Sequence, residues 1–380
     1  MPRSGTPERS SALPPTAPTP KTPKAGGDAG PAASRAPAGR APVGQRGRRL
    51  LAAAAAVLAV ALLFVAYLQV SRTYPENSDE SNDLLMAWDM LHGNVLLHGW
   101  YLSDVSFYPT ELPQYAMLEG LLGLQADVAH IAAAMTYTLA VLFAVLLARG
   151  PGDRPSGRSA WPRMALAGGL MIAPQLGVGV FVLLLSVGHI GSAVPLMLTW
   201  LVIDWAKPRW LVPVIVGLLL TWVLVADPLV LVVGIVPLVA VCGLRVLRAL
   251  WSARPPDRGA ALQASWYEAA LAAAAVLAYG LADLVNRLLS ASGGLIVHPL
   301  GYQLAPVHTW AKHAWVTGEG LLALFGAKPQ GPAPELAFAL LHLAGVALVA
   351  WATCRVARRF VRWPDVVSQV LLVAIALNIL

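Results

Sequence analysis

The sequence predicts an all-α fold, a polytopic transmembrane helical bundle with short amphipathic helices in its extracytoplasmic loops. Two observations predict it: 57% of the residues are hydrophobic and only 12% are charged, and the mean hydropathy is +0.63. A third is the recurrence of apolar runs of about 20 residues, the length needed to cross a hydrocarbon core of about 30 Å. Together they exclude a soluble globular fold.

Residues 1–49 differ from the rest of the chain. They are rich in Pro, Ala, Gly, Ser and Thr, and carry nine Lys and Arg against two acids. Such a segment cannot bury enough apolar surface to offset its chain entropy, so we expect a disordered basic cytoplasmic tail. The first apolar run is too long for a signal peptide. The tail serves as a topology signal, or it attracts anionic lipid through its last arginines.

Residues 50–380 form the predicted transmembrane domain of about nine spans. The expected spans are 50–70, 127–148, 164–186, 190–206, 210–226, 228–247, 262–289, 335–353 and 366–380. The last run would make a helix of about 22 Å at about 1.5 Å per residue, which is shorter than the hydrocarbon core. We therefore expect the last span to be truncated, as in a fragment of a longer protein.

The distribution of basic residues predicts the orientation. With a cytoplasmic N-terminus, fourteen Lys and Arg fall in the inner loops and nine in the tail, and only four fall outside. This asymmetry follows the positive-inside rule for multi-pass proteins of the cell membrane. Arg outnumbers Lys 22 to 5, which is typical of a high-GC bacterial genome.

Thirteen of the twenty acids and seven of the eight histidines are expected at or near the outer face, where the two long loops are 71–114 and 290–334. In the first loop, Asn77 and Glu80 form a capping-box pattern at the start of a helix over 78–92. Its apolar stripe, Leu84, Leu85, Trp88 and Leu91, would rest on lipid or on neighbouring helices. Further short outer helices are expected over 116–124 and 315–326.

Carboxylates are concentrated at the start of the 78–92 helix. Asp79 and Glu80 lie in its first turn, where acids stabilise the helix dipole by about 0.3–1 kcal/mol. That structural explanation accounts for both residues as well as a catalytic one does. Asp83 lies four residues after Asp79 and is expected on the same helix face.

A resemblance favours the catalytic explanation. Asp79-Glu80, "AWDMLHGN" (87–94), "FYPTELPQY" (107–115) and "AMLEGLLGL" (116–124) follow the first span, an arrangement that resembles the GT-C membrane glycosyltransferases. The likeness is greatest to the branch with protein O-mannosyltransferases and lipid A aminoarabinose transferases, and covers about 50–150. Ser81-Asn82 stands where the family commonly has Arg-Tyr, which places the substrate contacts in question.

The resemblance implies an inverting sugar transfer at the extracytoplasmic face from a polyprenyl-phosphate donor. The acceptor is a hydroxyl of an unidentified glycan, lipid or protein. Asp79 would be the general base, and Glu80 the alternate base or an orienting partner. General-base help contributes roughly 10²–10⁴-fold in rate.

The leaving lipid phosphate needs positive charge or donors near the outer surface. The candidates are His189, Arg287 and Lys312. Each has a structural alternative: a turn histidine for His189, an i,i+4 pair with Asp283 for Arg287, and an interfacial snorkelling residue for Lys312.

No cofactor is expected, with a divalent metal beside Asp79 and Asp83 as the weaker alternative. The expected partners are the lipid-linked sugar and the bilayer, and no nucleic acid. Two rival classes remain, a non-enzymatic polytopic membrane protein and a lipid or solute transporter. A transporter usually carries charges or broken helices at the membrane midplane, where this sequence has mainly His342.

Overall fold

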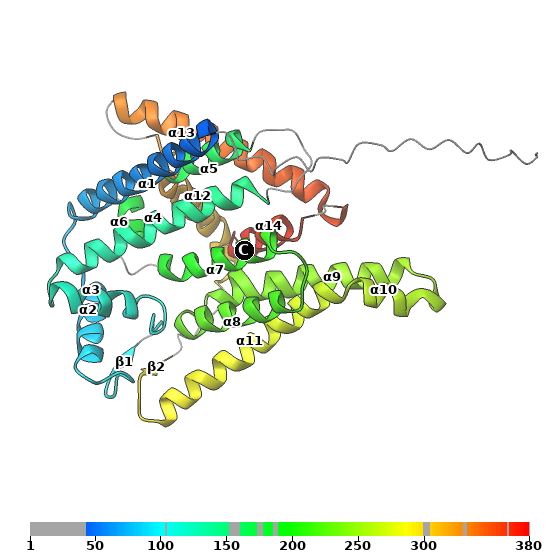
Figure 1. Cartoon of the computed structure of the whole chain (residues 1–380), viewed down its shortest axis with the longest axis horizontal. Coiled ribbons are helices and arrows are strands. Elements are labelled where there is room, and N and C mark those ends of the chain that lie inside the picture. The colour runs from blue at the N-terminus through cyan, green and yellow to red at the C-terminus, as the bar shows by residue number, and fades with distance from the viewer. Residues whose placement is uncertain are drawn as a thin grey trace, which may run out of the picture. The chain divides into compact units, whose positions relative to one another are not determined.

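The computed structural model describes residues 43–102, 105–151, 160–172, 178–184, 189–298, 305–329, 333–362 and 365–379 (Figure 1). The chain divides into two units, Met1–Ala54 and Ala55–Leu380. Of the first, the structure describes the beginning of helix α1 (Val43–Ser71). The predicted disorder of 1–42 lies outside the described residues, while residues 43–49, placed in the same tail, are helical. All that follows concerns the second unit.

The described elements are almost all helical. After α1 they are α2 (Ser78–Leu91), β1 (Tyr101–Leu102), α3 (Leu112–Leu122), α4 (Asp127–Arg149), α5 (Trp161–Met171), α6 (Val178–Leu184), α7 (Ile190–Trp205), α8 (Leu211–Ala226), the π-helical turn η1 (Leu231–Ile235), α9 (Val236–Ser252), η2 (Pro255–Asp257), α10 (Arg258–Ala264), α11 (Trp266–Ala291), β2 (Ile296–Val297), η3 (Val307–Thr309), α12 (Trp310–Leu324), α13 (Ala333–Arg358), η4 (Phe360–Arg362) and α14 (Val366–Ile379).

Five helical stretches are long and apolar enough to cross a membrane. They are Arg46–Ser71, Asp127–Arg149, Leu231–Ser252, Trp266–Ala291 and Ala333–Arg358. Three shorter apolar helices, Ile190–Trp205, Leu211–Ala226 and Val366–Asn378, coincide with three further predicted spans. By length and composition the chain is therefore a helical membrane protein.

The predicted span over 164–186 differs from the structure. Two shorter helices, α5 and α6, stand in its place, and residues 173–177 between them lie outside the described part of the chain. The helix that corresponds to the predicted span over 262–289 starts later than predicted, because α10 ends at Ala264 and α11 begins at Trp266.

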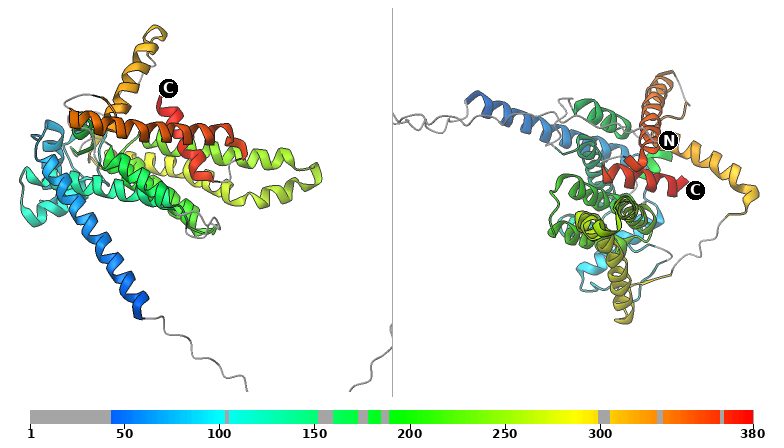
Figure 2. Two further views of the ribbon diagram at one scale, coloured as in Figure 1. Left: turned by 90° about the horizontal axis from the view of Figure 1, so that it is seen from above. Right: turned by 90° about the vertical axis from the view of Figure 1, so that its right-hand side faces the viewer.

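The largest core lies among α7, α8, α9, α11 and α14. Small residues let these helices approach closely: a Cβ added at Gly217 of α8 would lie 3.4 Å from the carbonyl oxygen of Ala274 in α11. Ala275, Ala278 and Ala282 continue the buried face of α11. The long helix α11 packs along both α8 and α9 (Figure 2).

A second core joins α1, α4 and α6. Tyr67 and Tyr137 meet edge to face with ring centroids 4.8 Å apart. Their hydroxyls donate to the carbonyl oxygens of Ile172 (2.9 Å) and Met171 (2.7 Å). These bonds fix the end of α5 against α1 and α4, because a carbonyl at a helix end has no partner within its own helix.

Both predicted outer loops contain more structure than was predicted, and they meet. The predicted short helices correspond to α2, α3 and α12. β1 pairs in parallel with β2, with Tyr101 opposite Ile296. His98 Nδ1 lies 2.7 Å from the carbonyl oxygen of Gly293. The two loops therefore form one structural region.

Candidate functional site

The first turn of α2 is built as the sequence predicts. The Asn77 side chain accepts hydrogen bonds from the backbone N–H groups of Asp79 and Glu80, both at 2.9 Å. Glu80 Oε2 accepts from the Asn77 backbone N–H at 3.2 Å, which completes the capping box. The helix ends at His92, and Gly93 follows with a φ of 102°. The structural role predicted for Glu80 is thus confirmed.

The buried face of α2 is not the predicted apolar stripe. Leu85 and Leu91 are 47% and 45% exposed. The buried face carries Glu80, Asp83, Leu84, Met86 and Ala87 and packs against α3 and α4. Two acids therefore point into the protein, because distant segments supply the surface against which α2 rests.

This burial separates the two carboxylates expected on one face. Asp79 is exposed, and the hydroxyl of the neighbouring Ser78 donates to Asp79 Oδ1 at 3.4 Å. Asp83 is 4% exposed, and its Oδ2 atom has no hydrogen-bond partner. Burial, followed by the charges of Glu111, Asp79 and Glu80, raises the pKa of Asp83 well above its ordinary value.

Glu111 is the second buried acid of this region. It lies just before α3 and is 3% exposed. Its Oε2 accepts from the Thr110 hydroxyl, and its Oε1 has no hydrogen-bond partner. Burial raises the pKa of Glu111 to about 7; the Thr110 bond opposes this rise and the charge of Asp227 adds to it.

Glu111 is held against the first turn of α7. A Cβ added at Gly191 would lie 1.9 Å from Glu111 Oε1 and 2.1 Å from its Cδ. No side chain fits at position 191 unless the carboxyl group moves. The neighbouring His189 has a φ of 62°, and its Nδ1 lies 2.8 Å from Oδ2 of the buried Asp227. Asp227 also accepts from the Leu229 backbone N–H at 2.9 Å.

Tyr115 lies among the acids. It is 1% exposed, and burial together with Asp83, Glu80, Glu111 and Glu119 raises its pKa well above the ordinary value. Its phenol therefore stays protonated. Glu119, one turn further along α3, has both carboxyl oxygens buried without a hydrogen-bond partner, and burial raises its pKa to about 7. We call Glu80, Asp83, Glu111 and Glu119 around Tyr115 the acid cluster.

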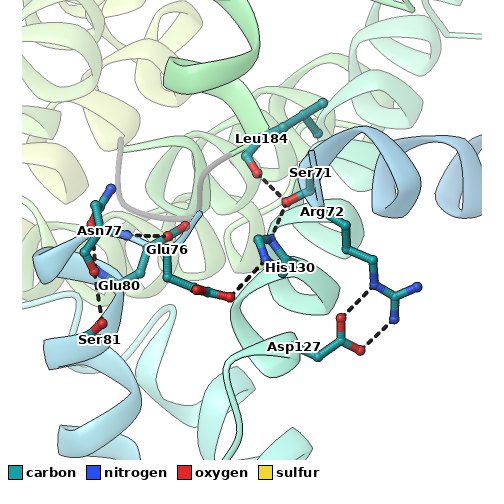
Figure 3. Close-up of polar contacts among 9 residues, drawn as sticks. All are labelled: Ser71, Arg72, Glu76, Asn77, Glu80, Ser81, Asp127, His130 and Leu184. Atoms are coloured by element: carbon teal, nitrogen blue, oxygen red, sulfur yellow. Dashed lines mark hydrogen bonds and ion pairs between the residues drawn. The ribbon is translucent and has the colours of Figure 1, made fainter. Parts of the chain in front are cut away.

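A second polar group, the paired network, lies nearby and is shown in Figure 3. His130 of α4 lies between two partners: its Nδ1 is 2.9 Å from Ser71 Oγ and its Nε2 is 3.0 Å from Glu76 Oε1. Arg72 donates to both carboxyl oxygens of Asp127, at 2.6 and 2.5 Å. Every charged member of this network has a partner of opposite charge or a proton to share.

The hydrogen bonds of the paired network determine its proton count. Ser71 donates to the Leu184 carbonyl oxygen at 2.8 Å, and a hydroxyl has one hydrogen. The bond between Ser71 and His130 therefore needs the hydrogen of His130 Nδ1. The bond between His130 Nε2 and Glu76 then needs one further proton, carried by the imidazole or by the carboxyl group.

The structure does not join the three residues predicted to bind the donor phosphate. His189 pairs with Asp227, and Arg287 pairs with Asp283 at 2.9 Å, the structural alternative expected from their i,i+4 spacing. Lys312 is exposed on α12. Among the described residues no hydrogen bond or ion pair links any two of the three.

No group of three His, Cys, Asp or Glu side chains within the described residues is arranged to hold a metal ion. Sequence reasoning assigned no role to Glu111, Glu119 or Glu76. One signal was present for the first two: each is a lone acid in a largely apolar stretch, "FYPTELPQY" or "AMLEGLLGL". Acids without charged neighbours in such stretches are candidates for burial.

Apolar residues beside this region line a partly open cavity of about 950 Å³ between α1, α4, α5 and α6. Leu63, Tyr67 and Val70 of α1 line it, with Val141, Gly168 and Leu184 opposite. Val70 precedes Ser71, and Leu184 accepts the Ser71 hydrogen bond, so the cavity reaches the paired network. Comparisons with protein families, curated proteins and solved structures find no match to this chain, and the site stands on its geometry alone.

Proposed function

We propose that the chain is a membrane glycosyltransferase that moves a sugar from a polyprenyl-phosphate donor to an acceptor hydroxyl, with inversion, at the face that carries α2 and α3. The observation that carries the proposal is the buried Asp83 with an unpartnered oxygen, beside Glu111 and one turn from Asp79. A carboxylate that must remove a proton from a hydroxyl works best when its pKa is raised toward the working pH.

The structure supports a different proton acceptor from the one that the family resemblance implies. Asp79 is exposed and shares a hydrogen bond with Ser78. Asp83 is buried and surrounded by like charges. We therefore assign the general base to Asp83, whose pKa is raised first by burial and then by the charges of Glu111 and Asp79. Glu80 is retained as the helix cap.

The apolar cavity supports the choice of donor. It is lined by residues from α1, α4, α5 and α6, and a chain of isoprene units requires a lining of this kind. From Ala59 to Val70 the lining follows α1 for about 16 Å, at about 1.5 Å per residue. A lipid tail held there would bring its phosphate to the end of α1, where α2 and the acid cluster begin.

The test is sugar transfer by membranes that contain the full chain, with a radiolabelled polyprenyl-phosphate sugar and equal protein abundance. We expect Asp83→Asn to reduce transfer by roughly 10²–10⁴-fold. Asp79→Asn should reduce it less, because Asp79 acts only through its charge. Asp257→Asn, an exposed acid in η2, is the matched control and should leave transfer unchanged.

Two outcomes would overturn parts of the proposal. Loss of transfer in Asp79→Asn with normal transfer in Asp83→Asn would return the general base to Asp79. Unchanged transfer in both variants, or no transfer by the wild-type chain, would favour a non-enzymatic membrane protein or a transporter.

A further inference from the structure

A charged pocket lies at the opposite end of α9 and α11 from the acid cluster. Its volume is about 430 Å³. The side chains that line it come from three segments, α9, the start of α11 and η4, and include Arg245, Arg248, Ser252, Ser265, Glu268 and Arg362. None of these residues takes part in the proposed sugar transfer.

The pocket has an excess of positive charge and of hydrogen-bond donors. Arg245 is engaged inside the protein: its Nε lies 3.4 Å from Glu268 Oε1 and it donates to Gln369 Oε1 at 3.0 Å. Arg248 and Arg362 are exposed, and neither side chain makes a hydrogen bond or ion pair with any residue that the structure describes. Two guanidinium groups and two serine hydroxyls therefore remain to bind a ligand.

These donors fit a phosphate group. A phosphate presents several oxygens that accept hydrogen bonds, and a guanidinium binds two of them side by side. Glu268 is the one acid among the lining residues that the structure describes, and Arg245 already neutralises it. The charge left to the ligand is thus about +2, which matches a phosphate mono- or diester.

The position of the pocket indicates that the phosphate belongs to a membrane lipid. α11 has 26 residues and is about 39 Å long at about 1.5 Å per residue, enough to cross a hydrocarbon core of about 30 Å. Beyond its far end at Ala291, Leu295 packs in one core with Met86 of α2 and Leu112 at the start of α3, beside the acid cluster. At the pocket end, Trp251 is 79% exposed and Trp266 is 42% exposed. Exposed tryptophans of this kind are typical of the membrane–water interface.

We propose that the pocket formed by Arg248, Arg362, Ser252 and Ser265 binds the phosphate of an anionic membrane lipid. The acyl chains would lie along the exposed apolar side of α9, where Leu247 is 48% exposed. Basic pockets between transmembrane helices at the cytoplasmic surface bind anionic headgroups in this way. The orientation predicted from the basic loops places this end in the cytoplasm.

The experiment titrates the purified full chain in detergent with phosphatidylglycerol, phosphatidylcholine or sodium phosphate at constant ionic strength. Binding is read from the unfolding midpoint and from native mass spectrometry. We expect phosphatidylglycerol to raise the midpoint, and phosphatidylcholine and free phosphate to have little effect. The double variant R248Q/R362Q should bind phosphatidylglycerol at least about tenfold more weakly.

R254Q/R258Q is the matched control, because it removes the same charge from nearby exposed residues outside the pocket. R248K/R362K keeps the charge and loses the paired guanidinium geometry, so it should bind with intermediate affinity even if the glutamine variant folds poorly. The proposal would be overturned if R248K/R362K bound phosphatidylglycerol as tightly as the wild type and R254Q/R258Q lost as much affinity for it as R248Q/R362Q. So would binding of free phosphate as tight as that of the lipid.

Discussion

The acid cluster and the paired network lie near the same end of the helices, but they differ in whether their polar atoms have hydrogen-bond partners. In the paired network, His130 is held between Ser71 and Glu76, and Arg72 holds Asp127 with two bonds. In the acid cluster, Asp83, Glu111 and Glu119 keep oxygens without partners. A buried polar group with partners contributes to stability, while one without partners costs stability and is retained when it serves another role. Four changes test this difference.

The largest effect on stability is expected where a buried partner is removed. His130→Ala would remove the bonds that Ser71 and Glu76 make to the imidazole. We expect a loss of about 3–5 kcal/mol in the free energy of unfolding. Denaturant unfolding of the full chain in detergent measures it. Glu76→Gln is the matched variant, because a glutamine amide can donate to His130 Nε2 and should cost far less. A similar loss in both variants would contradict the proton count given for this network.

In the acid cluster, by contrast, the buried carboxyl groups should stabilise the fold more when they are protonated, so the stability of the chain should depend on pH. Glu111 has a pKa of about 7 in the folded chain and an ordinary value of 4.5, so the folded chain binds more protons between these values. Stability should therefore rise as the pH falls from about 7 toward 4.5, by up to about 3 kcal/mol from this group. Glu111→Gln should remove this part of the gain when unfolding midpoints at pH 5 and 7.5 are compared. An equal change of the midpoint with pH in the wild type and in Glu111→Gln would contradict the assignment.

Gly191 lies in the first turn of α7, where this helix contacts Glu111 of the acid cluster. Its replacement is expected to have a smaller effect. In Gly191→Ala the new methyl group would overlap the Glu111 carboxyl group, so the acid must move, at a cost of about 1–3 kcal/mol. The pH dependence should then resemble that of Glu111→Gln. Gly280→Ala is the control, since a Cβ at that position of α11 meets nothing within 4 Å. Equal stability of the two variants would show that Glu111 is not confined by α7.

The smallest effect is expected at the exposed edge of the paired network. Arg72 and Asp127 side chains are 40% and 36% exposed, and ion pairs of this exposure contribute little to stability because solvent screens them. Arg72→Ala should therefore lower the unfolding free energy only slightly, and less at high salt. A loss as large as that of His130→Ala and independent of salt would place this pair with the buried bonds of His130.

Local signals predicted the elements of the fold and only part of the site. The capping box of Asn77 and Glu80, the helix over 78–92 and the apolar helices follow from patterns within a few residues. The buried face of α2 does not, because it depends on α3 and α4, which pack against it. The pairing of His189 with Asp227, 38 positions apart, likewise has no local signature. Asp79 was favoured because its position matched a motif, while the burial of Asp83 is a tertiary property.

The pairing of β1 with β2 has a consequence for biogenesis. His98 and Gly293 are 195 positions apart, and ribosomes add roughly 5–20 residues per second. During synthesis β1 is therefore without its partner strand β2 for about 10–40 seconds, until α11 and the segment after it have been made. During that interval the region beyond α1 is open to proteases and chaperones, and a chain that stalls before β2 would leave this region incomplete.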